Sequence, residues 1–389
     1  MPPQQKEQSV PIQSSRFPLF VLTVAHGIAI GTLVLLASAV SAQPGALHGR
    51  VVDAATGEPL PGVSVFLSQT TRGAATDADG QFAFSGVTAG SYVLVASMVG
   101  YERAHWNVDV SGEPVQAAFR LRRAEASLGA VEVVADNRAW RRQLRRFERL
   151  FFGPTPRSRS CTILNPEVLD FADHGGAFTA TASAPFVFEN RALGYRVTYV
   201  IERFRAEGET VVFGGFPRYE DLPGAPDQRE RWRDAREEAY RGSFQHFLRA
   251  LARGTALDEG FDAYLLDDFR IPRWSEGGPA FVPRVPFDSL VTTVADGAHA
   301  LAFERTLHVE YLRERRHRDA PQPFGGGAER HQRSALRLHA PAVRFHPLGY
   351  ILDPFDVSGP NYTTYGYWSW EGHVGDLLPL DYVSGSPTP

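Results

Sequence analysis

Cysteine is nearly absent from this sequence of 389 residues, in which Cys161 is the only one. A single cysteine excludes a disulfide within the chain, so packing alone must hold the fold together, even in an oxidising compartment. We expect Cys161 to be a small buried hydrophobic residue rather than a reactive thiol.

An excess of positive charge is also lacking. The sequence has 40 basic and 44 acidic residues, a formal net charge of -4 and a pI near 6.3, and Lys6 is its only lysine. A protein that neutralises the phosphates of nucleic acid needs a basic excess, so we expect no nucleic-acid partner. With 43% hydrophobic residues, the chain is long enough to bury two ordinary cores.

Familiar catalytic motifs are missing as well. The sequence contains no helical histidine pair of the zinc-peptidase type, no His-x-x-Glu pair, no Gly-x-Ser-x-Gly elbow and no glycine-rich phosphate loop before a helix. The 12 histidines are scattered. His246 with Arg249 and Asp170 is the only grouping we considered for catalysis, and only residue type supports it. We therefore assign no catalytic residue, no metal ligand and no cofactor.

The N-terminal segment, residues 1–42, has the features of a secretory signal. Lys6 and Arg16 precede an apolar stretch that begins at Phe17, and the small residues Val40-Ser41-Ala42 stand before Gln43. This order predicts export, with cleavage after Ala42. The alternative is an uncleaved anchor, because the apolar stretch approaches the length of about 20 residues that spans a bilayer. We expect a protein of the periplasm or the outer membrane.

Residues 43–123 predict a small β-sandwich. Seven short apolar runs alternate with turn residues, as in antiparallel sandwiches. Pro59, Pro61 and Gly62 suit a turn between the first two runs, and Asp79-Gly80 predicts a hairpin between the third and fourth. The runs are 46–52, 63–67, 73–76, 81–84, 92–98, 103–110 and 115–121.

This region resembles the carboxypeptidase regulatory-like domain, a transthyretin-like sandwich of seven strands. The resemblance rests on a motif that runs through the whole domain: Gly49, Val51, Asp53, Thr56-Gly57-Glu58-Pro59-Leu60-Pro61-Gly62-Val63, Thr76-Asp77, Asp79-Gly80, Phe82 and Val99-Gly100-Tyr101. The resemblance implies a fold and no reaction. Peptidase activity is not implied, because the zinc-bearing domain of such peptidases is a separate region. The domain also begins many outer-membrane receptors that continue into a β-barrel of many hundred residues. This sequence is too short to contain such a barrel, so we do not expect a receptor of that type.

Residues 124–159 predict a linker with an exit strand at 128–134 and an amphipathic helix from Arg138 to Phe152. Aromatic residues lie on one helix face and arginines on the other. A basic amphipathic helix can lie on an anionic membrane, so contact with a membrane surface through Arg138 to Phe152 is possible. We expect instead that the aromatic face packs on the second domain while the arginines face water.

Residues 160–389 predict a second antiparallel β-rich domain with one or two helices. The strands from 177 to 202 are typical of a meander, and one long helix is expected from Asp227 to Gly254. The region resembles uncharacterised cell-envelope proteins of Bacteroidota, which implies a lineage and an envelope location but no activity. The segments that carry this resemblance are 161–169, 193–199, 239–251, 366–370 and 377–382.

The densest unusual feature is an aromatic cluster near the C-terminus, which we take as the candidate binding site. Such rings can stack on sugars or anchor a protein partner. If the segment is a strand, Trp368 and Trp370 point to one side and Tyr365 and Tyr367 to the other, so that one set fills the core. The candidate binding residues are Tyr365, Tyr367, Trp368 and Trp370.

The sequence as a whole predicts a mainly β protein, a transthyretin-like sandwich followed by a β-rich domain. We expect a non-enzymatic binding or adaptor protein of the cell envelope whose partner is an envelope protein or a glycan. An alternative is an envelope hydrolase acting on peptides or glycans, with a dispersed active site in the second domain. A purely structural spacer is the third possibility.

Overall fold

The computed structural model of the chain describes residues 45–124, 138–208, 210–267, 274–275, 278–279, 282–294, 297–320, 331–356 and 359–385. The expected signal segment 1–42 and the expected exit strand 128–134 lie outside these residues. Residues 42–389 form one compact unit. No helix among the described residues is both long enough and apolar enough to cross a membrane.

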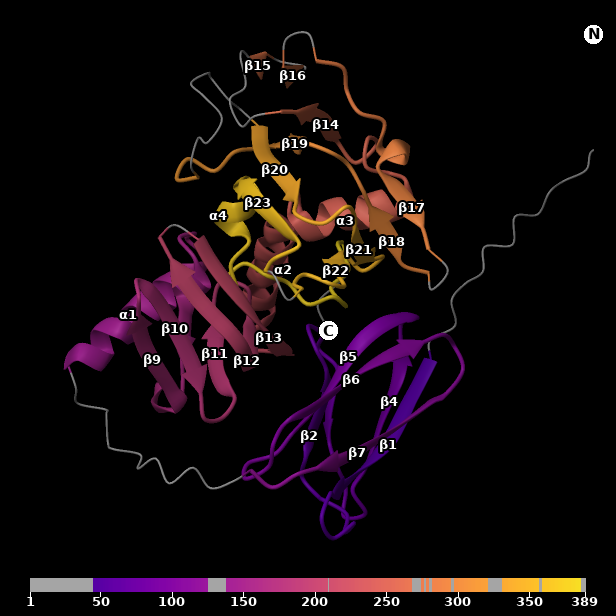
Figure 1. Cartoon of the computed structure of the whole chain (residues 1–389), viewed down its shortest axis with the longest axis vertical. Coiled ribbons are helices and arrows are strands. Elements are labelled where there is room, and N and C mark those ends of the chain that lie inside the picture. The colour runs from indigo at the N-terminus through magenta and orange to yellow at the C-terminus, as the bar shows by residue number, and fades with distance from the viewer. Residues whose placement is uncertain are drawn as a thin grey trace, which may run out of the picture. The chain divides into compact units, whose positions relative to one another are not determined.

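The first region is a sandwich of two sheets, with strand orders β4-β1-β7 and β3-β2-β5-β6 (Figure 1). Alternating side chains point inward, as in β4, where Phe82, Phe84 and Val87 are buried. All pairs are antiparallel except β1 with β7, which is parallel. The predicted seven-stranded sandwich is confirmed. Its strands are β1 Gly45–Asp53, β2 Ser64–Leu67, β3 Gly73–Ala75, β4 Gln81–Val87, β5 Gly90–Ser97, β6 Ala104–Val110 and β7 Val115–Leu121.

The prediction of a hairpin at Asp79-Gly80 was wrong, although the turn itself is present. The Asp77 carboxylate accepts hydrogen bonds from the backbone N–H groups of Asp79 and Gln81, and Gly80 has a φ of 71°. However, β3 pairs with β2, whereas β4 pairs with β1 in the other sheet. The turn therefore carries the chain from one sheet to the other, which local turn chemistry cannot distinguish from a hairpin.

Asp53 explains part of the sandwich motif. Its buried carboxylate accepts hydrogen bonds from Arg123, from Ala55 and Thr56 N–H and from the Tyr101 hydroxyl. The Arg123 guanidinium is the main cause that holds the pKa of Asp53 far below its usual range. Asp53 thus joins the end of β1 to the loop after β5 and to the end of β7, a structural role.

The second region begins with helix α1, Arg138–Phe152, packed on a six-stranded sheet (Figure 1). Phe147 and Phe151 are fully buried against Phe178, Phe204 and other residues of the sheet. The prediction that the aromatic face of this helix packs on the second domain is confirmed. The sheet consists of β8 Cys161–Ile163, β9 Leu169–His174, β10 Ala177–Ala182, β11 Phe186–Asn190, β12 Tyr195–Glu207 and β13 Thr210–Asp221, with the short helices η2 Ser158–Ser160 and η3 Pro166–Val168.

The meander predicted over 177–202 was wrong. Strands β10 and β11 do not pair with each other; each pairs with a different end of β12. On its other edge β12 pairs with β13 along nearly its whole length. A strand of 13 residues has room for two short partners end to end, which the order of strands along the chain does not reveal.

The single helix predicted from Asp227 to Gly254 is two helices, α2 Pro226–Tyr240 and α3 Phe244–Arg253. Gly242, with a φ of 77°, breaks the run, because this left-handed conformation does not continue a helix. Ser243 then caps α3 by accepting a hydrogen bond from His246 N–H. The predicted end at Gly254 is confirmed, since Gly254 is the left-handed C-cap of α3.

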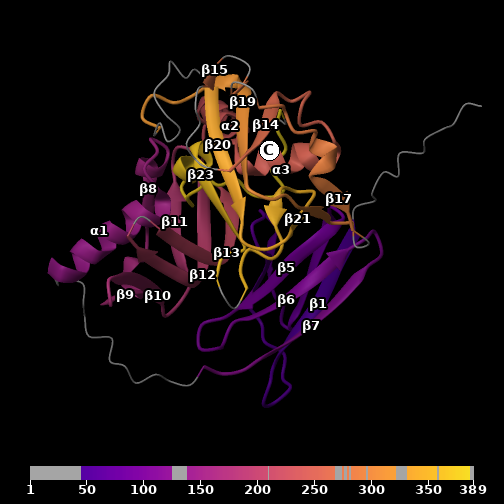
Figure 2. The same ribbon diagram turned by 45° about the horizontal axis from the view of Figure 1, so that its top comes forward.

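The rest of the chain forms a four-stranded sheet, β14-β19-β20-β23, a second one, β17-β18-β21-β22, and a small pair, β15-β16. Figure 2 shows the long strands β19 and β20 side by side. The elements are β14 Phe261–Leu266, β15 Trp274–Ser275, β16 Gly278–Pro279, η4 Phe287–Ser289, β17 Val291–Thr293, β18 His299–Leu301, β19 Thr306–Arg315, β20 His331–Leu338, β21 Val343–His346, β22 Tyr350–Ile351, β23 Tyr362–Gly366 and α4 Tyr367–Glu371. The predicted fold class, mainly β with a few helices, is confirmed.

The sandwich and the second region share a junction built around the turn after β2. The backbone N–H of Gln69 donates to Pro217 O of β13 at 2.6 Å, and Gln69 O accepts from Leu380 N–H at 2.7 Å. A small apolar cluster seals the contact, with Phe66 and Val95 from the sandwich and Val200 and Phe216 from the six-stranded sheet. The sandwich is therefore fixed to the second region by backbone hydrogen bonds and buried apolar surface.

Candidate functional site

A pocket of about 850 Å³ lies beside this junction. Its walls come from the break between α2 and α3, from β19, from the turn between β21 and β22, and from residues 380–384, with Thr88 contributed by the sandwich. This volume is in the range of small-molecule sites, which are few in a protein and are the first place to seek a function. The lining holds arginines and carboxylates in equal numbers together with three tyrosines.

The helix break shapes one wall of the pocket. The N–H of Gly242 donates to His246 Nδ1 at 3.0 Å, and Gly242 O accepts from Trp368 Nε1 at 2.8 Å. A Cβ at Gly242 would lie 1.9 Å from Gln332 Oε1 and 2.7 Å from the Tyr311 ring. Glycine is thus required here both for its conformation and for its lack of a side chain.

His246 lines the pocket but has no ring nitrogen left for catalysis. Because Nδ1 accepts from Gly242, we place the ring proton on Nε2, which then donates to Glu259 Oε2 at 2.8 Å. Burial lowers the pKa of His246, which keeps the ring neutral. With both nitrogens bonded, His246 holds the start of α3 in place and cannot also take a proton from a substrate.

The carboxylate of Glu259 is likewise bonded to donors of the protein itself. Burial acts to raise its pKa, but hydrogen bonds from Thr255, Arg253 and His246 outweigh it and lower the pKa to about 2. Both of its oxygens accept from these protein donors. Glu259 is therefore a fixed anion that orders the end of α3.

The C-terminal segment forms the opposite wall and is fastened by two charged residues. Arg249 donates to the backbone oxygens of Leu348, Tyr382 and Leu380 at 2.8, 2.8 and 2.9 Å. Glu237 accepts from the hydroxyls of Tyr382 and Ser384 and from a backbone N–H at 385. These contacts satisfy both side chains.

Asp381 extends this wall to the sandwich. Its carboxylate accepts from the backbone N–H of Thr71 at 3.0 Å and from the Thr71 hydroxyl. Because Asp381 also lines the pocket, these hydrogen bonds fix one face of the pocket to the sandwich.

The third side of the pocket holds charged groups with unused bonding capacity, and Glu314 there accepts a hydrogen bond from Gln332 Nε2 at 3.4 Å. Arg241 Nε donates to Glu237 at 2.9 Å, and its Nη1 lies 3.6 Å from Glu314 Oε1. Arg313 donates one bond to Asp258 O. No other hydrogen bond of these two guanidinium groups is formed within the described part of the chain, although each has five N–H donors. Burial raises the pKa of Glu314, which makes it the one pocket carboxyl with such a shift among those described.

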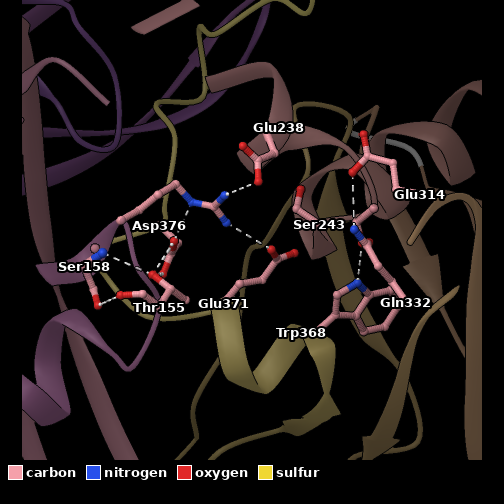
Figure 3. Close-up of polar contacts among 12 residues, drawn as sticks. Thr155, Ser158, Glu238, Ser243, Glu314, Gln332, Trp368, Glu371 and Asp376 are labelled. Carbon is pink, nitrogen blue, oxygen red and sulfur yellow. Dashed lines mark hydrogen bonds and ion pairs between the residues drawn. The ribbon is translucent and has the colours of Figure 1, made fainter. Parts of the chain in front are cut away.

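A second charged cluster is buried outside the pocket lining (Figure 3). Arg157 lies 2.8 Å from Asp376, 3.4 Å from Glu371 and 3.5 Å from Glu238. Burial raises the pKa of Asp376 to about 6 and that of Glu371 well above its ordinary value. Glu371 Oε1 has no donor among the described residues. Arg157, Glu371 and Asp376 are buried and join the loop after α1 to α4 and the segment that follows it, whereas the side chain of Glu238 is 65% exposed. We assign this cluster a structural role.

The aromatic residues predicted to bind do not lie on one strand, and that part of the prediction was wrong. Gly366, with a φ of 72°, ends β23, and Tyr367, Trp368 and Trp370 belong to α4. These three rings are buried, and Trp370 stacks on the ring of His317. They pack within the protein, whereas Tyr365 on β23 is half-buried. The prediction of a ligand stacking on an exposed ring now concerns Tyr365 alone.

The structure brings together two of the three residues considered for catalysis. His246 and Arg249 line the pocket, but Asp170 is exposed on β9 and is not part of the lining. Sequence reasoning missed Arg241, Arg313 and Glu314, which line the pocket. Nothing local marks them, since they meet the helix break only through the fold. No group of three or more metal-ligating residues is found within the described ranges.

Comparison with known proteins identifies the sandwich. Residues 47–134 match the profile of the CarboxypepD_reg-like domain family, which confirms the resemblance of the first domain. The resemblance of the second region to Bacteroidota proteins stays a prediction. No curated protein sequence matches the chain.

Each of the following solved structures is similar to about a fifth of this chain. The group B streptococcus pilus 2b backbone protein is 17% identical, with 21% of this chain and 42% of that chain covered and a TM-score of 0.19. Catechol 1,2-dioxygenase from Acinetobacter is 13% identical over 23% of this chain and 55% of that chain, with a TM-score of 0.19. Klebsiella pneumoniae 5-hydroxyisourate hydrolase is 23% identical over 21% of this chain and 92% of that chain, with a TM-score of 0.18. The chain spans about half the length of the first two.

Proposed function

We propose, from the premise that residues 47–134 are a CarboxypepD_reg-like domain, that this protein is an exported, non-enzymatic binding protein of the cell envelope. The pocket beside the junction binds a small polar ligand that carries both signs of charge, such as a short peptide with free ends. The sandwich serves as an adaptor that is fixed to the binding region at the Gln69 turn.

The proposal rests on a difference between two sets of charged groups in the pocket: one set is bonded to the protein itself, and the other has unused bonding capacity. His246, Arg249, Glu237 and Glu259 are bonded to the protein itself and give the pocket fixed walls. On the third side of the pocket, the guanidinium groups of Arg241 and Arg313 keep unused donors. The carboxyl of Glu314, which accepts one long bond from Gln332 at 3.4 Å and lies 3.6 Å from Arg241, keeps acceptor capacity for a ligand. Cationic donors next to a carboxyl suit a zwitterion.

The hydrolase alternative requires a general acid and a general base that can both reach the substrate. Glu314, with its raised pKa, is the one described pocket residue that fits the role of an acid. The carboxylates of Glu237 and Glu259 have lowered pKa values and bond to protein donors through both oxygens. Binding without turnover is therefore the function that the geometry supports best.

The test uses trialanine as the probe, because it carries a free amino group and a free carboxylate. We expect trialanine to raise the thermal midpoint of the protein, since a ligand at about 100 times its Kd stabilises the folded state by about 2.7 kcal/mol. N-acetyl-trialanine amide, which has no charged ends, should give no shift. Arg241→Gln should weaken trialanine binding roughly tenfold to 100-fold in calorimetric titration, because it removes a charge-assisted donor.

Arg233→Gln is the matched control. Arg233 lies on α2, the helix that Arg241 caps, and it also pairs with a glutamate, Glu230, but it is not part of the pocket lining. This variant should bind trialanine like the unmodified protein. Equal loss in both variants would contradict a specific role for Arg241. Cleavage of trialanine, followed by mass spectrometry, would replace the binding proposal with the hydrolase.

A further inference from the structure

The outward face of α1 carries a row of arginines, which we call the arginine stripe. At 100° per residue, its members lie within about 100° of the helix circumference and extend over about 16 Å of its length. All of them are exposed, and the only acidic residue on α1, Glu148, is half-buried. The members of the stripe are Arg138, Arg141, Arg142, Arg145 and Arg149.

The opposite face of α1 is fully used by the protein. Phe147 and Phe151 are completely buried in the core of the six-stranded sheet. Trp140 Nε1 donates to Leu169 O, which ties the first turn of the helix to β9. The helix thus has no apolar face left to insert into a bilayer, so any partner must be held by charge at the surface.

The flank of the stripe is neutralised by local contacts, which leaves the charge concentrated on the outward face. Arg146 pairs with Asp173 at 2.8 Å and lies over the ring of Phe178. Arg142, Arg145 and Arg149 form no ion pair with any described residue. A straight, convex row of guanidinium groups gives no hollow that could enclose a small anion.

We propose that the arginine stripe binds the anionic headgroups of a phospholipid bilayer. Guanidinium groups form paired hydrogen bonds to phosphate, and an extended flat surface of phosphates matches a straight row of arginines better than a compact ligand does. The proposal is independent of what the pocket binds.

The strength of this contact can be bounded. Each arginine near an anionic surface contributes about fivefold to binding, and the attraction is confined to about 10 Å in 0.1 M salt. Binding is therefore expected at about 0.05 M salt and should be abolished at about 0.5 M salt. Since no aromatic residue belongs to the stripe, tryptophan fluorescence should not shift on binding.

The experiment measures sedimentation of residues 42–389, the compact unit, with lipid vesicles. Vesicles that contain phosphatidylglycerol should carry the protein down, whereas pure phosphatidylcholine vesicles should not. Reversing three charges, with Arg142→Glu, Arg145→Glu and Arg149→Glu, should reduce binding roughly 100-fold or more. The glutamine versions of the same three changes should give a smaller loss and guard against misfolding of the reversed variant.

The matched control reverses three arginines of another helix, α2. Arg229, Arg231 and Arg233 lie on α2, where Arg231 and Arg233 already pair with Asp227 and Glu230. Their change to glutamate alters the net charge by the same amount and should leave most vesicle binding intact. Equal losses of vesicle binding in the two triple variants would show that binding depends on net charge alone. That result would overturn the proposal that the arginine stripe binds the headgroups.

Two further results would also overturn the proposal. Equal binding to phosphatidylcholine vesicles would show that headgroup charge is not recognised. Preferential binding to double-stranded DNA in competition with the anionic vesicles would assign the stripe to a soluble polyanion instead.

Discussion

Replacing Arg157 with methionine is expected to destabilise the protein by about 3 to 5 kcal/mol at pH 8. The guanidinium of Arg157 is the cation for two buried carboxylates, Asp376 and Glu371. Removing one partner of a buried ion pair leaves an uncompensated charge, which costs about that much. Chemical denaturation of the variant and the unmodified protein measures the difference.

The expected loss depends on pH, and its sign follows from the raised pKa values. Asp376 has a pKa of about 6 in the folded protein and an ordinary value of 3.8, so the folded state holds a proton that the unfolded state releases between these values. Stability from this group is present at low pH and declines as pH rises from about 4 to about 6. Without Arg157 both carboxyls should titrate higher, so the destabilisation should be smaller at pH 5 than at pH 8.

Arg146→Met is the control for this prediction. Arg146 also forms a 2.8 Å ion pair, with Asp173, but the two side chains are 40% and 51% exposed. An exposed pair contributes about 0 to 1 kcal/mol, so the control should lose little stability and show little dependence on pH. A loss in Arg157→Met as small as that of the control would show that the buried carboxylates do not depend on their cation.

Replacing Gly242 with alanine should destabilise the protein by about 2 to 5 kcal/mol. A left-handed conformation costs a residue with a Cβ about 1 to 2 kcal/mol. Overpacking adds about 1 to 3 kcal/mol, because the new methyl group would overlap Gln332 and the Tyr311 ring. Thermal or denaturant unfolding measures the total, and trialanine binding should weaken as well, since Gly242 shapes the pocket wall.

Gly254→Ala separates the two costs. Gly254 has a φ of 69°, close to that of Gly242, but nothing lies within 4 Å of the position of its Cβ. Its change to alanine should therefore cost only the conformational part, about 1 to 2 kcal/mol. If the two variants lost the same stability, the close approach at Gly242 would not be a constraint on this site.

The relation of sequence to structure is clearest in the sandwich. Alternation of inward and outward residues and the chemistry of turns are local properties, so the sequence alone places all seven strands. The partners of those strands are not local. The turn at Asp79-Gly80 looks the same whether its flanking strands pair with each other or join two sheets, and only the sheets decide it.

The helix pair shows the same limit. A stripe of apolar residues runs from Trp232 through Leu251, and a glycine within a helical pattern is usually tolerated at a modest cost. Here Gly242 takes a left-handed conformation because His246 and Trp368 bind its backbone from both sides. Trp368 is 126 residues away, and no local pattern contains that information.

By itself, the sequence determined the mainly β class, the sandwich and its family, because short-range alternation and turn motifs specify them. The tertiary structure alone decided where the pocket lies and which charged residues it leaves open to a ligand. Contacts such as Glu237 with Ser384 and Arg249 with Leu380 join residues more than 130 positions apart. Such contacts form when separate elements pack, so their geometry depends on the whole fold rather than on any one segment.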